Sequence, residues 1–154
     1  DPRRPEHRAA VDPLRLVAKR GQKDTLILDD TYNSSPPSAL AALDLLQDLE
    51  GRKIAVLGDM LELGDYEEQG HLRVGRRAAE VADELLVVGE LGELIGRGAR
   101  EGGMAADRIH AAPDSEAAAE LLTPRLRPGD VILVKGSRGV HMEQIVEALV
   151  QPES

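Results

Sequence analysis

Residues 53–59 read KIAVLGD, a continuous apolar run that ends in a glycine and an aspartate. Such runs are typical of strands in a parallel sheet, because helices cover both of its faces. Residues 130–136, DVILVKG, have the same character and form the clearest strand in the sequence. Two buried strands of this kind predict an α/β domain.

Segments of helical periodicity alternate with strands on both sides of these runs. A helix opened by Ser35-Pro36-Pro37 should end before Gly51, because serine caps helices, proline fits the first turn and glycine suits the end. The short turn between the first two strands predicts a hairpin. We expect strands at 14–19, 25–30, 53–59, 84–89, 108–112 and 130–136, and further helices at 68–83, 90–102, 114–123 and 138–150.

This order of elements predicts the overall architecture of the domain. Alternating strands and helices favour a Rossmann-like, doubly wound, mostly parallel six-stranded sheet with helices on both faces. The hairpin adds one antiparallel edge strand. The first twelve residues contain two prolines and come before any periodic pattern. We expect residues 1–13 to form an inter-domain linker and residues 14–154 to form the domain.

The composition excludes several classes of protein. The 154 residues include 19 Lys and Arg against 28 Asp and Glu, so the net charge is −9. An acidic chain without a basic stripe does not favour nucleic acid as a partner. The absence of Cys excludes disulfides and thiolate metal sites. No apolar run approaches the ~20 residues that a membrane helix needs. The chain begins with Asp1 rather than Met, so we expect a piece of a longer protein.

Polar side chains gather where two of the predicted strands end, which is where open α/β sheets bind ligands. The first group, 29–33, reads DDTYN, and the second, 135–138, reads KGSR. The second group precedes a predicted helix, whose free N–H groups and positive dipole suit a carboxylate or a phosphate. The residues alone therefore predict an α/β domain that binds a small anionic ligand.

Simpler interpretations of these residues remain open. Ser137 could serve only as the cap of the last helix. An aspartate of the first group could serve only as the partner of an arginine, and Arg138 only as the partner of a surface acid such as Glu143. His71 lies inside a predicted helix and is better explained as a hydrogen-bonded histidine than as a ligand. The histidines lack metal-ligand spacing, so we expect no metal site. The chain contains no GxGxxG, GxxxxGK[ST] or GxSxG motif.

Three blocks of sequence resemble the C-terminal domain of a Mur ligase, of the type that adds D-alanyl-D-alanine. They are LILDDTYNSSPPSALAALDLL at 26–46, KIAVLGDMLELG at 53–64 and VILVKGSRGVHMEQIVEAL at 131–149. The resemblance implies a longer enzyme with a UDP-binding N-terminal domain and a central ATPase domain, both absent from this chain. The central domain would carry the P-loop and bind most of the ATP and Mg²⁺.

The resemblance also implies an activity. In the full enzyme ATP would phosphorylate the carboxylate of a UDP-N-acetylmuramoyl tripeptide, and the amine of D-alanyl-D-alanine would attack the acyl phosphate. This domain would close over ATP, present the dipeptide and be inactive when isolated. The setting implied is peptidoglycan precursor synthesis in the bacterial cytoplasm, by a monomer whose third domain contacts its own central ATPase domain.

The matching positions imply roles for individual residues. ATP binding is implied for Arg15, Asp30, Tyr32 and Asn33, with the Asp30 carboxylate accepting hydrogen bonds from ribose hydroxyls. Binding of the dipeptide is implied for Lys135, Ser137 and Arg138. Asp59 and His71 also match positions of the family, without an assigned role, and no metal ligand is implied.

Two other functions remain open from the sequence. One is a different amide ligase of the same superfamily, such as a folylpolyglutamate synthase, which would be expected to have a histidine where this chain has Asn33. The other is a nucleotide-binding domain without catalysis. A P-loop encoded upstream of this segment would favour the ligase over the second alternative.

Overall fold

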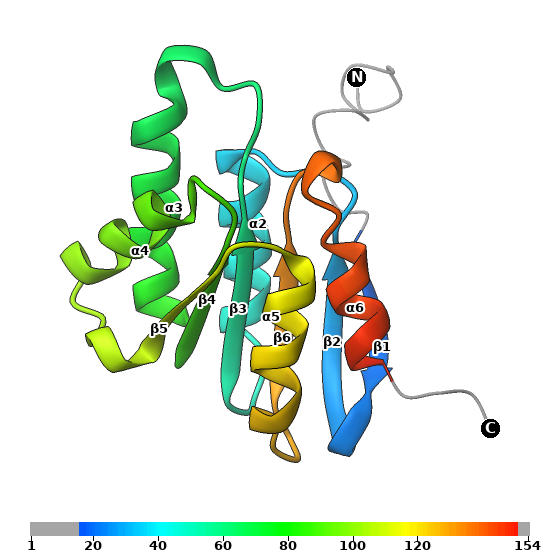
Figure 1. Ribbon diagram of the computed structural model, residues 1–154. Helices are drawn as coiled ribbons and strands as arrows, with labels where there is room; N and C mark the ends of the chain where they lie inside the picture. The colour runs from blue at the N-terminus through cyan, green and yellow to red at the C-terminus, as the bar shows by residue number, and fades with distance from the viewer. Residues whose placement is uncertain (1–15, 151–154) are drawn as a thin grey trace, which may run out of the picture.

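The computed structural model describes residues 16–150, which fold around one six-stranded sheet (Figure 1). The strand order is β1 (Val17–Gly21), β2 (Thr25–Asp30), β6 (Val131–Lys135), β3 (Lys53–Gly58), β4 (Glu84–Val88) and β5 (Ile109–Ala112). β1 pairs antiparallel with β2, and every other pairing is parallel. The predicted fold class, including the antiparallel edge strand, is confirmed.

Helices cover both faces of the sheet. One face carries α2 (Pro36–Gln47), α3 (Glu67–Val81) and α4 (Gly92–Glu101), and the other carries α5 (Ser115–Leu122) and α6 (Glu143–Leu149) (Figure 1). Strand side chains alternate between the two layers, so Leu133 packs on the first face while Ile132 and Val134 pack on the second. No helix within residues 16–150 is long and apolar enough to cross a bilayer.

The predicted Ser35 cap is present, and Asp114 caps a second helix. The Ser35 side chain accepts the backbone N–H of Ser38 and forms a reciprocal capping box at the start of α2. The Asp114 carboxylate accepts the backbone N–H of Ala117 at 2.8 Å and caps α5. These local bonds fix where each helix leaves the sheet edge.

Glycines allow α3 and α4 to lie unusually close. A Cβ added at Gly75 would overlap the carbonyl oxygen of Ile95, and one added at Gly98 would overlap the carbonyl oxygen of Leu72. The backbones of the two helices therefore meet without intervening side chains. This contact fixes the orientation of α3, which begins just beyond the carboxyl end of β3.

The last helix begins later than the sequence predicts. Residues Arg138–Val140 form a 3₁₀ turn, His141 adopts a left-handed conformation with φ of 54°, and α6 starts only at Glu143. Met142, just before α6, packs its sulfur where a Cβ on Gly58 or on Gly136 would be. A regular helix from residue 138 was predicted because the periodic apolar positions continue back to Met142, and that prediction is wrong at its start.

The first strand also differs from its predicted bounds. β1 runs over Val17–Gly21, whereas 14–19 was expected. Residues 14 and 15, together with the predicted linker 1–13, lie outside the described residues. The remaining strands begin and end within a residue of their predicted positions.

Candidate functional site

The sheet topology creates a crevice beside the carboxyl end of β6. β6 lies between β2 and β3, and the chain leaves those two strands toward the face of α2 and α3. After β6 the chain instead turns toward α6 on the opposite face. Loops that part in this way open a crevice at a switch point of the sheet, which is where α/β domains bind ligands. The predicted groups 29–33 and 135–138 therefore do meet at one edge.

A buried ion pair connects the two groups. Lys135 and Asp30 occupy opposite positions in the β2–β6 register, and the Lys135 Nζ donates to the Asp30 carboxylate at 2.7 Å. Both side chains are 2% exposed or less. Lys135 also donates to the backbone carbonyl of Asn33 at 3.0 Å. The pair therefore holds the loop after β2 against the end of β6 and presents neither charge to solvent.

This arrangement bears on the expected roles of both residues. Asp30 was expected to accept hydrogen bonds from ribose and Lys135 to contact the dipeptide, but in this structure each satisfies the other. The alternative interpretation, in which an aspartate of the first group pairs with an arginine, is wrong, because both aspartates pair with lysines. Asp30 pairs with a lysine, and Asp29 pairs with Lys19 at 2.8 Å.

Asp29 shapes the turn that leads to Tyr32. Its Oδ1 accepts hydrogen bonds from the Thr31 hydroxyl at 2.7 Å and from the Thr31 backbone N–H at 3.2 Å. Burial alone would raise the pKa of Asp29, but the hydrogen bonds from Lys19 and Thr31 outweigh it and hold this pKa below its ordinary value of 3.8. Asp29 therefore stays ionised and keeps the turn fixed at neutral pH.

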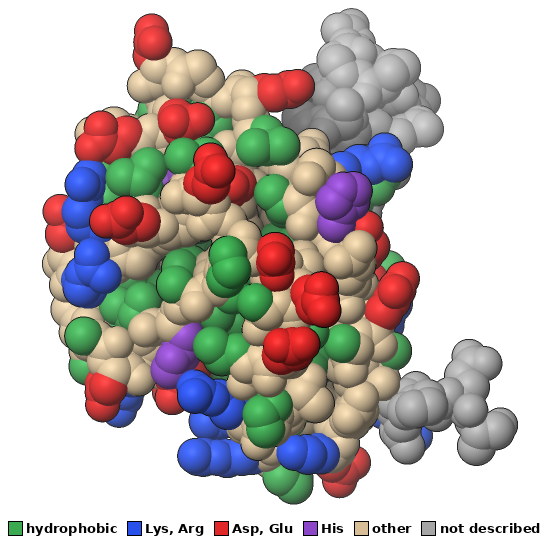
Figure 2. Space-filling model, in the orientation of Figure 1, with side chains coloured by type: hydrophobic (Ala, Val, Ile, Leu, Met, Phe, Trp, Pro, Cys, Tyr) green, Lys and Arg blue, Asp and Glu red, His purple; other side chains and the backbone are tan. Residues whose placement is uncertain are grey.

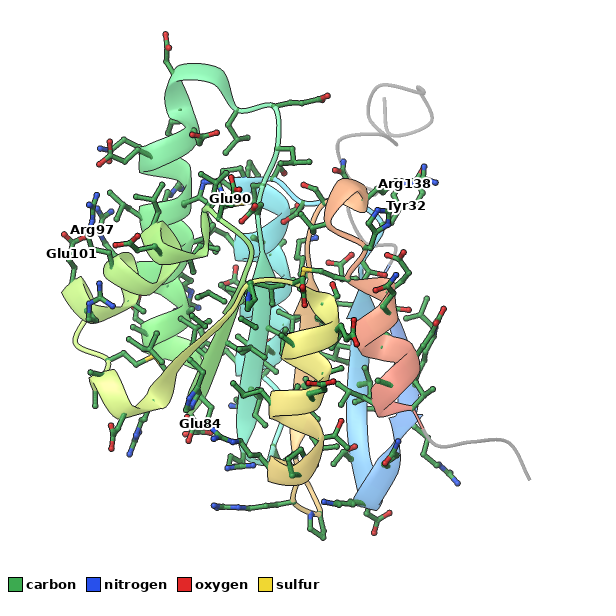
Figure 3. All side chains as sticks on the ribbon, viewed as in Figure 1. Tyr32, Glu84, Glu90, Arg97, Glu101 and Arg138 are labelled. Atoms are coloured by element: carbon green, nitrogen blue, oxygen red, sulfur yellow. The ribbon has the colours of Figure 1, made fainter. Side chains whose placement is uncertain are left out.

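Tyr32 and Arg138 form the exposed part of the edge. The guanidinium carbon of Arg138 lies 5.0 Å from the centre of the Tyr32 ring, within cation–π distance (Figure 3). Within residues 16–150 no carboxylate forms an ion pair with Arg138, and Glu143 pairs instead with His141 at 3.5 Å. The interpretation of Arg138 as a partner of Glu143 is therefore wrong.

An open groove of about 720 Å³ lies beside this pair of side chains. Its lining mixes one guanidinium with hydroxyl, imidazole and carboxylate groups, contributed by Asp29, Thr31, Tyr32, Arg138, Gly139, His141 and Glu143. The mixture suits a small polar ligand that carries both a carboxylate and an amine, because groups of both signs are within the same groove.

Ser137 has a structural role at this edge. Its hydroxyl accepts the backbone N–H of Leu61 at 3.2 Å, and its own N–H donates to the backbone carbonyl of Asp59 at 3.3 Å. Ser137 does not cap α6, which starts at Glu143. The expected helix N-terminus directly after Arg138 is therefore absent.

Asp59 and His71 support the loop after β3. His71 is fully buried, its Nε2 accepts the backbone N–H of Met60 at 3.0 Å, and its Nδ1 donates to the Glu67 carbonyl at 2.6 Å. It is thus the hydrogen-bonded histidine that was expected. Asp59 accepts the backbone N–H of Leu91 at 2.9 Å, and burial raises the pKa of its carboxyl. Both side chains fix backbone segments around the crevice.

Some groove residues were missed by sequence reasoning. Gly139 and His141 were placed inside a regular helix, whereas they lie in the 3₁₀ turn and at the left-handed residue that follows it. Glu143, the first residue of α6, was considered only as a partner of Arg138. A glycine one residue after Arg138 is the signal that could have indicated an interrupted helix. Arg15, expected to face the phosphates, lies outside the described residues. Within residues 16–150 no group of three or more His, Asp or Glu is placed to hold a metal ion.

Comparisons with known proteins agree on one family. The family model described as "Mur ligase, glutamate ligase domain" matches residues 14–138. The UDP-N-acetylmuramoyl-tripeptide--D-alanyl-D-alanine ligase of Bacillus subtilis is 36% identical over 92% of this chain and 31% of its own length. The enzyme of that name from Escherichia coli is 35% identical over 89% of this chain and 29% of its own length.

Solved structures give the same result. The MurF ligase from Thermotoga maritima in complex with ADP has a TM-score of 0.71 and 33% identity, covering 86% of this chain and 29% of that one. MurF from Acinetobacter baumannii has a TM-score of 0.72 and 32% identity, with the same coverage. This chain thus spans about a third of the length of the relatives it matches.

Proposed function

The chain belongs to the Mur ligase family, and on that premise we propose that it is the C-terminal domain of an ATP-dependent ligase joining D-alanyl-D-alanine to a UDP-N-acetylmuramoyl tripeptide. Curated relatives that bear this name are 31–36% identical to the chain. Because the chain matches only about a third of their length, the other domains would bind the UDP-linked substrate and most of the ATP.

The observation that carries the proposal is the exposed Arg138 at the switch point of the sheet. The dipeptide offers one carboxylate, and a guanidinium can bind both oxygens of a carboxylate at once. Stacking against Tyr32 holds the guanidinium at the rim of the groove. We assign dipeptide binding mainly to Arg138, while Ser137 and Lys135 act by holding the loops on either side of it.

We assign the neighbouring loop to ATP. Tyr32 and Asn33 are exposed beyond the end of β2 and would face the nucleotide on the central domain, together with Arg15. Asp30 would act through Lys135, because the Lys135 ammonium group donates hydrogen bonds both to the Asp30 carboxylate and to the Asn33 carbonyl. Mg²⁺ would be bound by the central domain.

The proposed reaction proceeds in two steps. The tripeptide carboxylate attacks the γ-phosphate of ATP, and ADP leaves as an acyl phosphate forms. The neutral amine of the dipeptide then attacks the carbonyl carbon, and the tetrahedral intermediate expels inorganic phosphate. The contribution of this domain is proximity, because it brings a bound amine to the acyl phosphate held on another domain. The reaction would serve peptidoglycan precursor synthesis in the bacterial cytoplasm.

The enzyme encoded by the complete gene tests the proposal. We expect a P-loop motif upstream of Asp1 and release of phosphate that requires ATP, the UDP-linked tripeptide and D-alanyl-D-alanine together. Glutamate in place of the dipeptide should give no product, which separates this ligase from one of the folylpolyglutamate type. Phosphate release with glutamate alone, or an upstream sequence without a nucleotide-binding domain, would contradict the proposal.

A further inference from the structure

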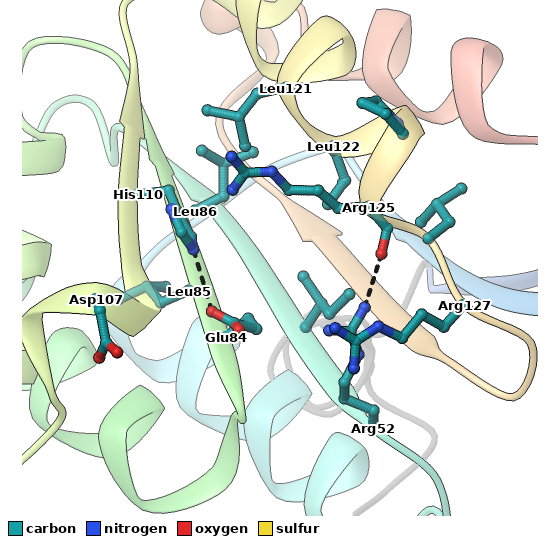
Figure 4. Close-up of a pocket in the computed structure, with 13 residues that line it drawn as sticks. Arg52, Glu84, Leu85, Leu86, Asp107, His110, Leu121, Leu122, Arg125 and Arg127 are labelled. Carbon is teal, nitrogen blue, oxygen red and sulfur yellow. Dashed lines mark hydrogen bonds and ion pairs between the residues drawn. The ribbon is translucent and has the colours of Figure 1, made fainter.

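Figure 4 shows a second pocket, of about 470 Å³. It lies at the amino ends of the parallel strands, whereas the candidate site lies at their carboxyl ends. It opens where β3 and β4 begin and where the 3₁₀ turn Thr123–Arg125 leads into β6. Nothing in the proposed ligase reaction uses this edge. The lining residues that matter are the arginines 52, 125 and 127, the pair Glu84 and His110, and the leucines 86, 121, 122 and 126.

Two of the arginines flank the buried Leu126: Arg125 ends the 3₁₀ turn, and Arg127 follows Leu126. Leu126 is 4% exposed and has an extended backbone, with φ of −63° and ψ of 139°. Leu126 packs into the core, whereas Arg125 and Arg127 are exposed and line the pocket.

This segment, residues 125–127, is anchored by one buried carboxylate. Asp130 is 1% exposed and receives two hydrogen bonds from the Arg52 guanidinium, at 2.8 and 2.9 Å, and one from the backbone N–H of Arg127 at 2.8 Å. Arg52 also donates to the backbone carbonyl of Arg125 at 2.9 Å. The positions from which the two outer arginines project are therefore fixed before any ligand arrives.

Two of the three arginines of the lining are left without an ion pair among residues 16–150. Asp130 neutralises Arg52, and Glu84 lies 3.1 Å from His110. Arg125 and Arg127 form no ion pair with a carboxylate of residues 16–150, and the lining also contains Asp107. The chain carries a net charge of −9, yet Figure 2 shows Lys and Arg side chains gathered beside a histidine on the lower part of this face. The unpaired guanidinium groups of Arg125 and Arg127 are therefore available to an anion at this rim.

The floor of the pocket is apolar. Leu86 and Leu122 are nearly fully buried and belong to the core under α5 and α6, and Leu121 covers them from the side. A concave apolar floor with few polar groups at its rim is the usual form of a small-molecule site. We propose that this pocket binds a small organic anion with an apolar body, the body on the leucines and the anionic group on Arg125 and Arg127.

Titration of this chain with anilinonaphthalene sulfonate tests the proposal, because this probe joins an aryl body to one anionic group. We expect saturable binding at one site and much weaker binding of the neutral analogue N-phenylnaphthylamine. The double variant Arg125→Gln/Arg127→Gln should weaken the binding of the sulfonate about tenfold or more, since it removes charged hydrogen-bond donors. Arg76→Gln, an exposed arginine on α3, is the matched control and should bind like the wild type.

Amide chemical shifts on adding the sulfonate give its location independently of the variants. We expect the shifts to cluster at residues 52–54, 84–86 and 121–127. Four outcomes would overturn the proposal: no saturable binding, equal affinity for the neutral analogue, shifts centred on 29–32 and 138–143, or a loss of affinity with Arg138→Gln instead of with the double variant. None of these outcomes affects the ligase proposal, which concerns the other edge of the sheet.

Discussion

Lys135 is the side chain whose position most changes the interpretation of its motif. In the sequence it is a cation beside a glycine, a serine and an arginine, and all of them resemble ligand contacts. In the structure it is 1% exposed and bound to Asp30. A buried charge is costly unless it is paired and hydrogen-bonded, so the two side chains depend on one another.

We predict that Lys135→Met destabilises this chain by about 3–5 kcal/mol, because it leaves the Asp30 carboxylate buried without a partner. The double variant Asp30→Leu/Lys135→Met should recover most of that loss, since no unpaired charge remains. Urea unfolding of the wild type, both single variants and the double variant measures the coupling. Equal free energies of unfolding for Lys135→Met and the wild type would show that the pair contributes nothing.

We predict that Arg138→Ala in the full-length enzyme weakens binding of D-alanyl-D-alanine by ~1.5–3 kcal/mol, the range for a hydrogen bond to a charged group. The Michaelis constant for ATP should change much less. Arg138→Lys should restore binding only in part, because an ammonium lacks the planar fork. Steady-state kinetics with each substrate varied separately measure both constants. If only the stability of Arg138→Ala falls, by less than about 1 kcal/mol, Arg138 is a surface residue without a substrate role.

Among the elements, those with strong local signals were predictable. β3 and β6 are continuous apolar runs, and α2 and α5 have capping residues that the structure confirms. The start of α6 was not predictable, because Met142 fills a space that exists only after Gly58 and Gly136 have been brought together by strand pairing. The pairing of Asp30 with Lys135 was not predictable either, because it depends on β2 and β6 being neighbours in the sheet.

The glycine contact between α3 and α4 gives a prediction with a control on the same helix. Gly98→Ala should destabilise the chain by about 1–3 kcal/mol, because its new Cβ would overlap the carbonyl of Leu72. At Gly96 the nearest atom to an added Cβ is 3.5 Å away, so Gly96→Ala should be neutral or stabilising by up to about 1 kcal/mol. Thermal unfolding of both variants tests the pair, and an equal effect at the two positions would contradict close backbone packing.

At the scale of the whole molecule, this chain has a complete core but no phosphate-binding loop. Two hydrophobic clusters enclose the sheet on its two faces. The sequence contains no GxxxxGK[ST] motif. We therefore predict that the isolated chain folds cooperatively and does not hydrolyse ATP. Phosphate release from the purified chain should equal the blank, and turnover that follows the protein peak through a final column would refute the prediction.

β6 is the last strand of the chain, yet it takes the third place in the sheet, between β2 and β3. Asp30 and Lys135, which pair across two neighbouring strands, are 105 residues apart. A ribosome must therefore release nearly the whole domain before β6 can pair with β2 of the hairpin on one side and with β3 of the β3–β5 sheet on the other. Until then the edges of β2 and β3 present unpaired backbone groups, which invite misassembly during synthesis. A nascent chain cut short of β6 would leave two unconnected half-sheets instead of a smaller version of the domain.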